Sequence, residues 1–269
     1  LGFNIMVAMN HYETYVRKAV ETGADFIVSG AGLPLELPAM VSDTDIAIAP
    51  IVSGARATAL ILKYWEKKYH RYPDFIVIEG PEAGGHLGFS RKQLEEKMDY
   101  DMEISEILKL VRVYEKKAER KIPVAVGGGI CDKARAEHEF MLGADLIQVA
   151  SRFITTKECD ADSAYKDAYL KAQKEDIVLV SSPVGMPGRA IRNPFLGHVE
   201  KGEVQRPQKC FGCLKHCNPA EIPYCITEAL IHAVKGDTEN GLLFCGAQGF
   251  LANQIETVQD VMEDLLGGL

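Results

Sequence analysis

Short apolar runs alternate with longer amphipathic segments along most of this chain, and this alternation constrains the fold more than any other feature. The apolar runs are continuous, as in Phe75-Ile76-Val77-Ile78, rather than interrupted at every second position by polar residues. Continuous runs are typical of strands that are covered by helices on both faces. Regular alternation of strand and helix implies right-handed crossovers, and therefore a parallel sheet.

The spacing predicts a series of strands with helices between them. We expect the strands at 2–7, 25–29, 45–49, 74–79, 122–127 and 145–149. We expect the helices at 10–22, 34–41, 54–70, 101–119 and 132–142, a further helix–strand pair at 162–173 and 176–181, and a late helix at 221–234. Gly23-Ala24-Asp25 and Gly143-Ala144-Asp145 punctuate the pattern alike, because in each a glycine ends a helix and Ala-Asp leads into a strand. This unit is typical of β/α barrels, although doubly wound sheets also use it.

We therefore predict an α/β fold, a TIM-type (β/α)8 barrel. Six strands are too few to close a barrel of eight, and the chain opens at Leu1 with a strand already under way. We expect the first two β/α units to be absent, so that residues 1–195 supply barrel strands 3 to 8. The sequence is loop-like from about residue 183, and we expect 196–269 to form a Cys-rich C-terminal extension packed on the barrel.

Composition excludes several classes of function. The 269 residues have a net charge of −8, with acidic and basic residues interspersed, so the basic stripe of a nucleic-acid-binding protein is missing. The longest apolar runs have the length of strands and do not support a membrane span. The first residues do not have the charged, apolar and small-residue order of a secretory leader, so we do not expect secretion. We expect a cytoplasmic protein that acts on a small-molecule substrate, with a homodimer as the candidate assembly.

The segment Glu79-Gly80-Pro81-Glu82-Ala83-Gly84-Gly85-His86 follows an apolar strand and indicates where the chemistry takes place. In a β/α barrel the active site lies at the carboxyl ends of the strands. Glycines without side chains let a flat ligand approach the backbone. A histidine beyond them can move a proton at neutral pH. The competing explanation is a glycine-rich turn that happens to precede a histidine.

Two further loops at strand ends are rich in small residues. Gly127-Gly128-Gly129 follows one predicted strand, and Gln148-Val149-Ala150-Ser151 ends the next. Barrels commonly bind a phosphate with the loops after their last two strands and the start of a short extra helix. Backbone N–H groups and a serine hydroxyl suit an anion there. The pair of loops predicts a phosphate site, whereas Gly-Gly-Gly alone would fit an ordinary tight turn equally well.

These pieces occur in the order and spacing of a known family. Gly2-Phe3-Asn4, Ser29-Gly30, the segment 79–86, Gly127-Gly128-Gly129-Ile130 and 148–153 together resemble the FMN-dependent nitronate monooxygenases, formerly 2-nitropropane dioxygenases. The FMN-dependent enoyl-acyl-carrier-protein reductases are related to that family. The resemblance covers about residues 1–195. A Gly-Gly-Met segment that supports the flavin in the family has no counterpart here, which agrees with two absent units.

The resemblance implies FMN as cofactor and assigns site residues. His86 would be the catalytic acid or base. The implied cofactor-binding residues are Asn4, Ser29, Gly30, Ala83, Gly84, Gly85, Gly127, Gly128, Gly129, Gln148, Ala150 and Ser151. Asn4 and Ser29-Gly30 would lie near the isoalloxazine with Ala83-Gly84-Gly85 beside it, and Gln148 would lie beneath the ribityl chain. The remaining glycines with Ala150 and Ser151 would hold the phosphate.

The activity implied is oxidation of alkyl nitronates or nitroalkanes by oxygen to carbonyl compounds and nitrite. One departure concerns this chemistry, since family members carry a basic residue near the flavin where this chain reads Ala49-Pro50-Ile51-Val52-Ser53. An alternative is an NAD(P)H-dependent FMN enoyl-thioester reductase on the same fold with the same histidine. A second alternative is a flavin-binding subunit or scaffold without turnover of its own.

Four of the seven cysteines crowd together as Cys210, Cys213, Cys217 and Cys225. Thiolates at this density suit zinc or an iron–sulfur cluster, and His216 is a further candidate ligand. The spacing matches neither a zinc ribbon nor a ferredoxin run. Buried, reduced cysteines explain the pattern equally well, because free cysteine packs as a small hydrophobe.

Arg189 and Arg192 follow the glycine-rich stretch after residue 183. They either reach the mouth of the barrel or are exposed, as loop arginines usually are.

Overall fold

The computed structural model describes residues 1–96, 98–207 and 209–267. These residues fall into two compact units, each built from several stretches of the chain. The first unit comprises 1–80, 97–127 and 138–148, and the second comprises 81–96, 128–137 and 149–269. The division predicted at residue 195 is a different one, and it stays a prediction.

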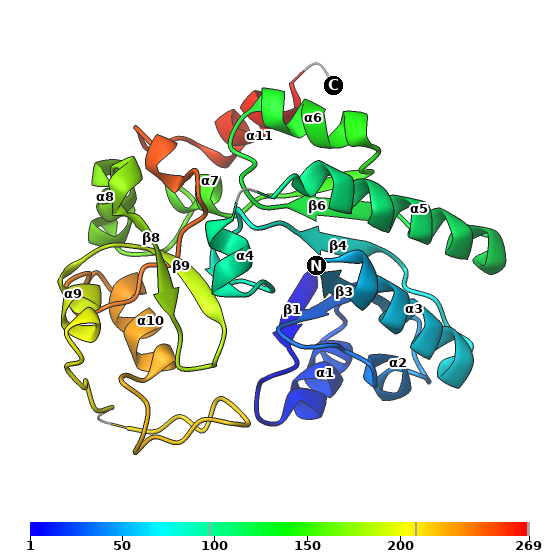
Figure 1. Ribbon diagram of the computed structural model, residues 1–269, viewed down its shortest axis with the longest axis horizontal. Coiled ribbons are helices and arrows are strands. Elements are labelled where there is room, and N and C mark those ends of the chain that lie inside the picture. The colour runs from blue at the N-terminus through cyan, green and yellow to red at the C-terminus, as the bar shows by residue number, and fades with distance from the viewer. Residues whose placement is uncertain (97, 208, 268–269) are drawn as a thin grey trace. The chain divides into compact units, whose positions relative to one another are not determined.

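The first unit contains a six-stranded parallel sheet (Figure 1). Its strands lie in the order β1-β2-β3-β4-β6-β7, so each strand pairs with the one that precedes it along this series. Their bounds are Gly2–Met6, Phe26–Gly30, Ala47–Val52, Ile76–Glu79, Val124–Gly127 and Leu146–Gln148. All six predicted strands are therefore confirmed, with ends shifted by at most three residues. Sequential order in a parallel sheet is the arrangement that a β/α barrel requires.

The inner strands β2, β3, β4 and β6 are continuous apolar runs because their side chains are buried on both faces. Val28, Ala49, Val77 and Ala125 come from four successive strands and form one buried cluster. On the alternate positions Ile27, Ile48, Ile76, Ile78 and Val124 are fully buried as well. A strand with only one covered face would show a polar residue at every second position.

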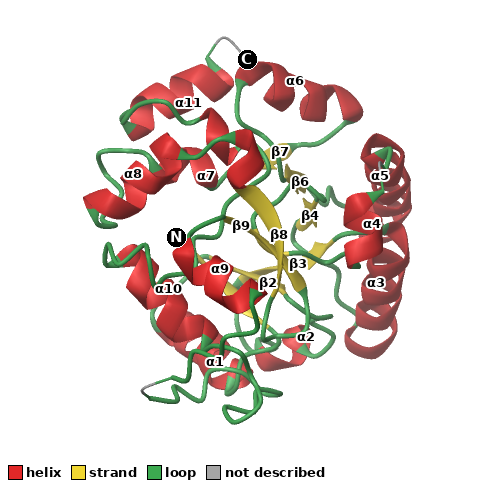
Figure 2. Ribbon diagram, turned by 60° about the vertical axis from the view of Figure 1, so that its left-hand side comes forward, coloured by secondary structure: helices red, strands yellow, loops and turns green. Residues whose placement is uncertain are grey.

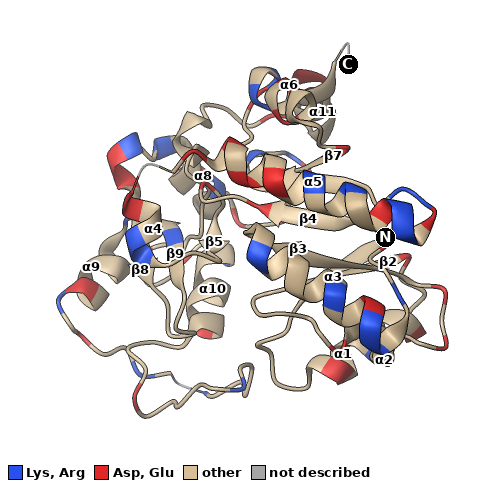
Figure 3. Cartoon of the chain, turned by 45° about the vertical axis from the view of Figure 1, so that its right-hand side comes forward, with Lys and Arg blue, Asp and Glu red and all other residues tan. Residues whose placement is uncertain are grey.

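Amphipathic helices connect these strands. The helices α1 (Tyr12–Glu21), α3 (Ala55–Tyr69) and α5 (Tyr100–Ala118) confirm the predicted positions. Figures 1 and 2 show α3 and α5 side by side, and Lys117 on α5 bonds the Glu66 carboxylate on α3 at 3.0 Å. Their outer faces carry interspersed basic and acidic residues (Figure 3). Burial of one face of each helix, as by Ile61, Leu62 and Trp65 in α3, fixes it against the sheet.

The second unit is built on a small antiparallel sheet of order β5-β9-β8. These strands are Gly85–His86, Pro187–Ile191 and Ile177–Ser181. The strand predicted at 176–181 is present as β8, but it belongs to this antiparallel sheet and not to the parallel sheet. The stretch 183–189 was expected to be a loop, and that expectation is wrong for Pro187 onward, because β9 pairs with both neighbours.

The remaining helices have the following bounds: α2 Leu37–Met40, α4 Arg91–Glu95, α6 Lys133–Leu142, α7 Ser151–Ile154, α8 Ser163–Lys171, α9 Pro194–Glu200, α10 Ile226–Val234 and α11 Val258–Leu266. Among the described residues, none of the helices is both long enough and apolar enough to span a bilayer. The predicted α/β fold class is confirmed. The described parallel sheet has six strands, fewer than the eight of a closed barrel, so the barrel is incomplete.

Candidate active site

His86 lies on β5 of the second unit, and its ring makes one polar and one aromatic contact. Its Nε2 is 2.7 Å from the Oγ of Ser182, and its ring meets that of Phe244 edge to face at a centroid distance of 5.0 Å. Burial lowers the pKa of His86 below its usual value of 6.5. The imidazole is therefore neutral at pH 7 and has a ring nitrogen that can accept a proton.

The hairpin β8–β9 holds Ser182 in this position. Ser182 begins the turn between the two strands, where its backbone N–H donates to the carbonyl of Met186 at 3.2 Å. Gly188 of β9 lies opposite His86, and a Cβ there would be 3.1 Å from the Phe244 ring and 3.2 Å from the Gly85 carbonyl. The absence of a side chain at Gly188 thus lets the histidine strand, β9 and Phe244 approach one another.

Arg189 fixes the loop that precedes His86. Its guanidinium donates to the carbonyl of Pro81 at 2.8 Å and to that of Ala83 at 2.5 Å. Burial lowers the pKa of Arg189, while the nearby Glu82 carboxylate favours its charge. The structure shows Arg189 as a half-buried side chain that is bonded within the second unit, and not as an exposed loop arginine. Arg192 instead makes an exposed ion pair with Glu200 at 2.9 Å.

The glycine before His86 packs against a late segment of the chain. A Cβ on Gly84 would be 2.6 Å from the carbonyl carbon of Cys245 and the nitrogen of Gly246. The bare face of Gly84 is therefore filled by protein backbone. Gly85 differs, because its φ is +72° and only the Phe244 ring comes within 4 Å of a Cβ built there. Of these two glycines, Gly85 is the one left open for a ligand.

The residues of the second unit that are predicted to bind the phosphate contact the chain around Glu82 and around Gly246. The Gly246 N–H donates to the Oγ of Ser151 at 3.0 Å, and Ser151 is the first residue of α7. The Cα of Gly129 lies against the side chain of Glu82. Glu82 in turn accepts at its carbonyl from the Ala247 N–H at 2.9 Å. Gly84 and Ser151 therefore both contact Gly246, and Gly129 contacts Glu82, which is bonded to Ala247.

The backbone N–H groups of Gly128 and Gly129 and the hydroxyl of Ser151 are donors that fit the phosphate of a cofactor such as FMN. Gly128 and Gly129 have φ values of +107° and +76°, a conformation that only glycine adopts readily and that exposes backbone N–H groups in loops. Ala150 precedes α7, whose first residue offers the Ser151 hydroxyl. The Arg189 guanidinium supplies a positive charge that offsets the Glu82 carboxylate.

The other predicted cofactor residues belong to the first unit. Gly30, Gly127 and Gln148 end the strands β2, β6 and β7, as expected for a site at the carboxyl ends. Ser29 is fully buried, and its hydroxyl bonds Tyr12 Oη at 2.7 Å and donates to the Ile5 carbonyl at 2.8 Å. The Ser29 side chain therefore ties β1 to β2 and α1, and the residue is covered on all sides, so its predicted contact with the cofactor stays a prediction.

Asn4 lies in the middle of β1, in register with Val28, and it is exposed. It lines a mainly apolar pocket of about 340 Å³ that Tyr15 of α1 and Thr22, which follows α1, also line. Its predicted proximity to a flavin ring stays a prediction.

Glu79 is a titratable group that the sequence reasoning did not single out. It ends β4, and burial raises the pKa of its carboxyl to about 7. The Tyr100 hydroxyl donates to the carbonyl oxygens of Glu79 at 3.2 Å and Ser53 at 3.1 Å. The sequence feature that could have identified Glu79 is its position directly after the apolar run Ile76-Val77-Ile78.

The clustered cysteines form no recognisable metal site in the part of the chain that the structure describes. Within residues 1–96, 98–207 and 209–267, no three His, Cys, Asp or Glu side chains are arranged to hold a metal ion. Cys210 is exposed, Cys213 and Cys217 are half-buried, and Cys225 is buried at the start of α10. Burial, and then the neighbouring thiols, raise the pKa of Cys217. The zinc or iron–sulfur assignment for Cys210, Cys213, Cys217 and Cys225 gains no support and stays a prediction from spacing.

Comparison with curated proteins finds similar sequences over half of this chain. A probable nitronate monooxygenase of Staphylococcus saprophyticus is 28% identical over 134 residues, which are 50% of this chain and 36% of that protein. One from Staphylococcus aureus is 30% identical over the same shares. The match thus spans about a third of the length of these relatives.

Solved structures share the fold across nearly the whole chain. FabK from Thermotoga maritima superposes with a TM-score of 0.76 at 24% identity, over 98% of this chain and 74% of that one. Nitroalkane oxidase from Streptomyces ansochromogenes superposes with a TM-score of 0.72 at 16% identity, over 98% and 80%. These likenesses confirm the predicted TIM-barrel type. The family model for nitronate monooxygenase matches residues 1–268, and this chain therefore belongs to the nitronate monooxygenase family.

Proposed function

We propose that this chain acts as an FMN-dependent oxidoreductase that oxidises alkyl nitronates or nitroalkanes with oxygen to carbonyl compounds and nitrite. The observation that carries the proposal is the neutral His86 imidazole, bonded to Ser182 beside the glycine loop 84–85. Family membership and the fold support it. The names of the similar proteins, a nitroalkane oxidase among them, agree with this substrate class.

The cofactor residues assigned from the sequence would bind different parts of FMN. Gly128, Gly129 and Ser151 would bind the phosphate, with Arg189 as the nearby positive charge. Gly85 would leave its backbone open to the ring. Bound FMN would supply the electron transfer, which no side chain of this set can perform.

His86 would act on the substrate's acidic carbon. A neutral nitroalkane must lose its α-proton before it is oxidised, and the His86 imidazole is the group placed to take it. Which ring nitrogen receives the proton depends on the tautomer that the Ser182 contact selects, because Ser182 occupies Nε2. Phe244 excludes water from one edge of the imidazole.

A reductase acting on enoyl thioesters is the second candidate. The specific observation in its favour lies on β3, where the family's basic residue is replaced by apolar, buried side chains such as Ala49 and Val52. A solved enoyl reductase domain, that of MlnA from Bacillus amyloliquefaciens, also shares the fold at a TM-score of 0.66. The scaffold alternative would bind flavin and turn over neither substrate.

Anaerobic stopped-flow mixing separates the three. Protein reconstituted with FMN is mixed with a nitronate or with NADH, and the flavin absorbance is followed. We expect rapid bleaching by the nitronate and recovery of colour with nitrite release when air is admitted. Rapid bleaching by NADH with no response to the nitronate would establish the reductase instead. If flavin binds but responds to neither reagent, the scaffold alternative is the one that remains.

A further inference from the structure

Glu82 belongs to the segment 79–86 that marks the candidate site in the sequence, yet the proposed oxidation gives its side chain no role. Its carboxyl group lies against Gly129, in the loop that follows β6. A Cβ built on Gly129 would collide with Oε2 of Glu82 and would be 3.0 Å from its carboxyl carbon. The Glu82 carboxylate therefore fills the space that the missing side chain of Gly129 leaves.

The loop 128–129 has the groups that bind an anion. Gly128 and Gly129 have φ values of +107° and +76°. Within the described part of the chain, no acceptor is found for the backbone N–H of either glycine. Successive N–H groups in a loop of this kind form a concave site for an anion. The carboxylate of Glu82 is thus an anion of the chain itself, placed against an anion site.

Charge, and not hydrogen bonding, keeps Glu82 there. Burial lowers the pKa of Arg189, and the Glu82 carboxylate offsets part of this by favouring the charged guanidinium. Arg189 is fixed by donating to the carbonyls of Pro81 at 2.8 Å and Ala83 at 2.5 Å. Among the described residues, no N–H or O–H group donates to the Glu82 carboxylate. The side chain can therefore leave the loop 128–129 without breaking a hydrogen bond.

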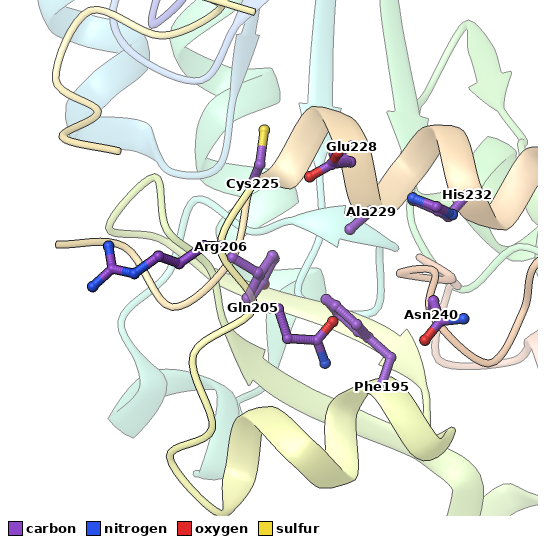
Figure 4. A pocket seen from close by; sticks show the side chains of 9 residues that line it. Phe195, Gln205, Arg206, Cys225, Glu228, Ala229, His232 and Asn240 are labelled. Atoms are coloured by element: carbon purple, nitrogen blue, oxygen red, sulfur yellow. The ribbon is translucent and has the colours of Figure 1, made fainter. Parts of the chain in front are cut away.

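A pocket beside α9 and α10 is the alternative place for an anion in the second unit. Its volume is about 280 Å³, and the carboxyl group of Glu228 is among the groups that line it. Arg206 is the lining residue with a fixed positive charge, but Figure 4 shows its guanidinium turned away from the other labelled side chains. It donates instead to the Ala220 carbonyl at 3.4 Å. We therefore expect a phosphate at the loop 128–129 and not in this pocket.

We infer that the Glu82 carboxylate occupies the subsite of the cofactor phosphate and competes with it, so that Glu82 determines how strongly the chain prefers FMN over riboflavin. The identity of the cofactor rests on the proposed function. A phosphate bonded to the N–H groups of Gly128 and Gly129 would lie beside the carboxylate, and like charges at such range repel. The Glu82 side chain must therefore leave when FMN binds. Riboflavin has no phosphate and does not require this.

Fluorescence titration of the full chain with FMN and with riboflavin tests the inference. Glu82→Gln should strengthen FMN binding by at least about tenfold and riboflavin binding by less than about twofold, because only the phosphate meets the lost charge. Glu82→Ala also empties the space beside Gly129, so it should strengthen FMN binding at least as much. Retained riboflavin binding shows that each variant folds.

The wild-type chain supplies a measurement that needs no variant. It should bind FMN no more than about tenfold more tightly than riboflavin, because displacing Glu82 cancels most of the gain from charge-assisted hydrogen bonds to a phosphate. A much stronger preference for FMN in the wild type would overturn the inference.

Glu239→Gln is the matched control, because it removes a carboxylate from an exposed position of the same unit. It should change neither affinity, and Arg206→Gln should leave FMN binding intact as well. The inference is overturned if both Glu82 variants leave the ratio of FMN to riboflavin affinity unchanged, or if Glu239→Gln raises that ratio equally. Weaker FMN binding by Arg206→Gln would place the phosphate in the other pocket and would overturn it too. None of these outcomes touches the proposed oxidation, whereas a chain that binds neither flavin would refute both.

Discussion

The imidazole of His86 and the hydroxyl of Ser182 are 2.7 Å apart, although 96 residues separate them in the sequence. The contact is local to one small antiparallel sheet, in which β5 carries the histidine and the β8–β9 turn carries the serine. Ser182 is itself 8% exposed, so its hydroxyl cannot turn freely toward solvent. The pair therefore sets the direction in which the imidazole points.

Replacing Ser182 by alanine should lower turnover of neutral nitroalkanes by about tenfold while leaving FMN content unchanged, because the base would be present but free to rotate. Ser181→Ala is the matched control, since Ser181 is the exposed neighbour at the end of β8. Steady-state kinetics and flavin absorbance measure both effects. Equal loss in the two variants would contradict a positioning role for Ser182.

The rate with a neutral nitroalkane should rise with pH to a plateau. Burial lowers the pKa of His86 from 6.5, so the neutral base is complete at a lower pH than for a free histidine. The half-maximal kcat/KM should therefore fall below pH 6.5. The preformed nitronate needs no proton removal and should not show this rise. A midpoint above pH 6.5 would mean that His86 is not the titrating base.

The inner strands of the first unit, β2, β3, β4 and β6, could be predicted because each one is a run of apolar residues covered on both faces, and this burial is visible in the sequence. The strand β9 could not, because Pro187 and Gly188 favour a turn locally and only pairing with β5 and β8 overrides that preference.

The motif residues of the site were found from the sequence, but their partners were not. His86, Gly129 and Ser151 stand in recognisable motifs. Ser182 and Phe244 stand in none, since their roles arise from long-range packing. The packing of Gly84 could not be predicted either, because its missing side chain admits the backbone of Cys245 and Gly246, which are distant in the sequence.

Gly84→Ala should destabilise the chain by about 1–3 kcal/mol, the range for overpacking a close contact, because the new Cβ would meet backbone atoms at 2.6 Å. Gly197→Ala is its control. Gly197 lies within α9 with nothing within 4 Å of a Cβ, so alanine there should stabilise the helix by about 0.5–1 kcal/mol. Denaturant unfolding of the two variants checks both signs. Unchanged stability of Gly84→Ala would contradict the close approach.

Glu79 should make stability depend on pH. Its pKa is raised by burial from 4.5 to about 7, so the folded state binds its proton more tightly than the unfolded state. The stabilisation is complete below pH 4.5 and is lost as the pH rises through about 7, by about 3 kcal/mol at most. Glu79→Gln should flatten this part of the curve, whereas Glu106→Gln, an exposed change on α5, should not. Urea unfolding from pH 4.5 to 8 measures the difference, and parallel curves for wild type and Glu79→Gln would refute it.

Arg189 should matter to the site through the loop that it holds. Arg189→Gln removes a half-buried guanidinium from the carbonyls of Pro81 and Ala83, and leaving two partly buried acceptors unpaired should cost about 1–3 kcal/mol. Because these residues immediately precede Gly84 and His86, flavin affinity should fall as well. Arg192→Gln, three residues along, breaks only an exposed pair with Glu200 and should cost about 0.5 kcal/mol or less. Unfolding free energies and flavin titration of the two variants measure the contrast. If Arg189→Gln weakened stability without any change in flavin binding, the loop 81–83 would be structural support alone, and the cofactor would have to be held elsewhere.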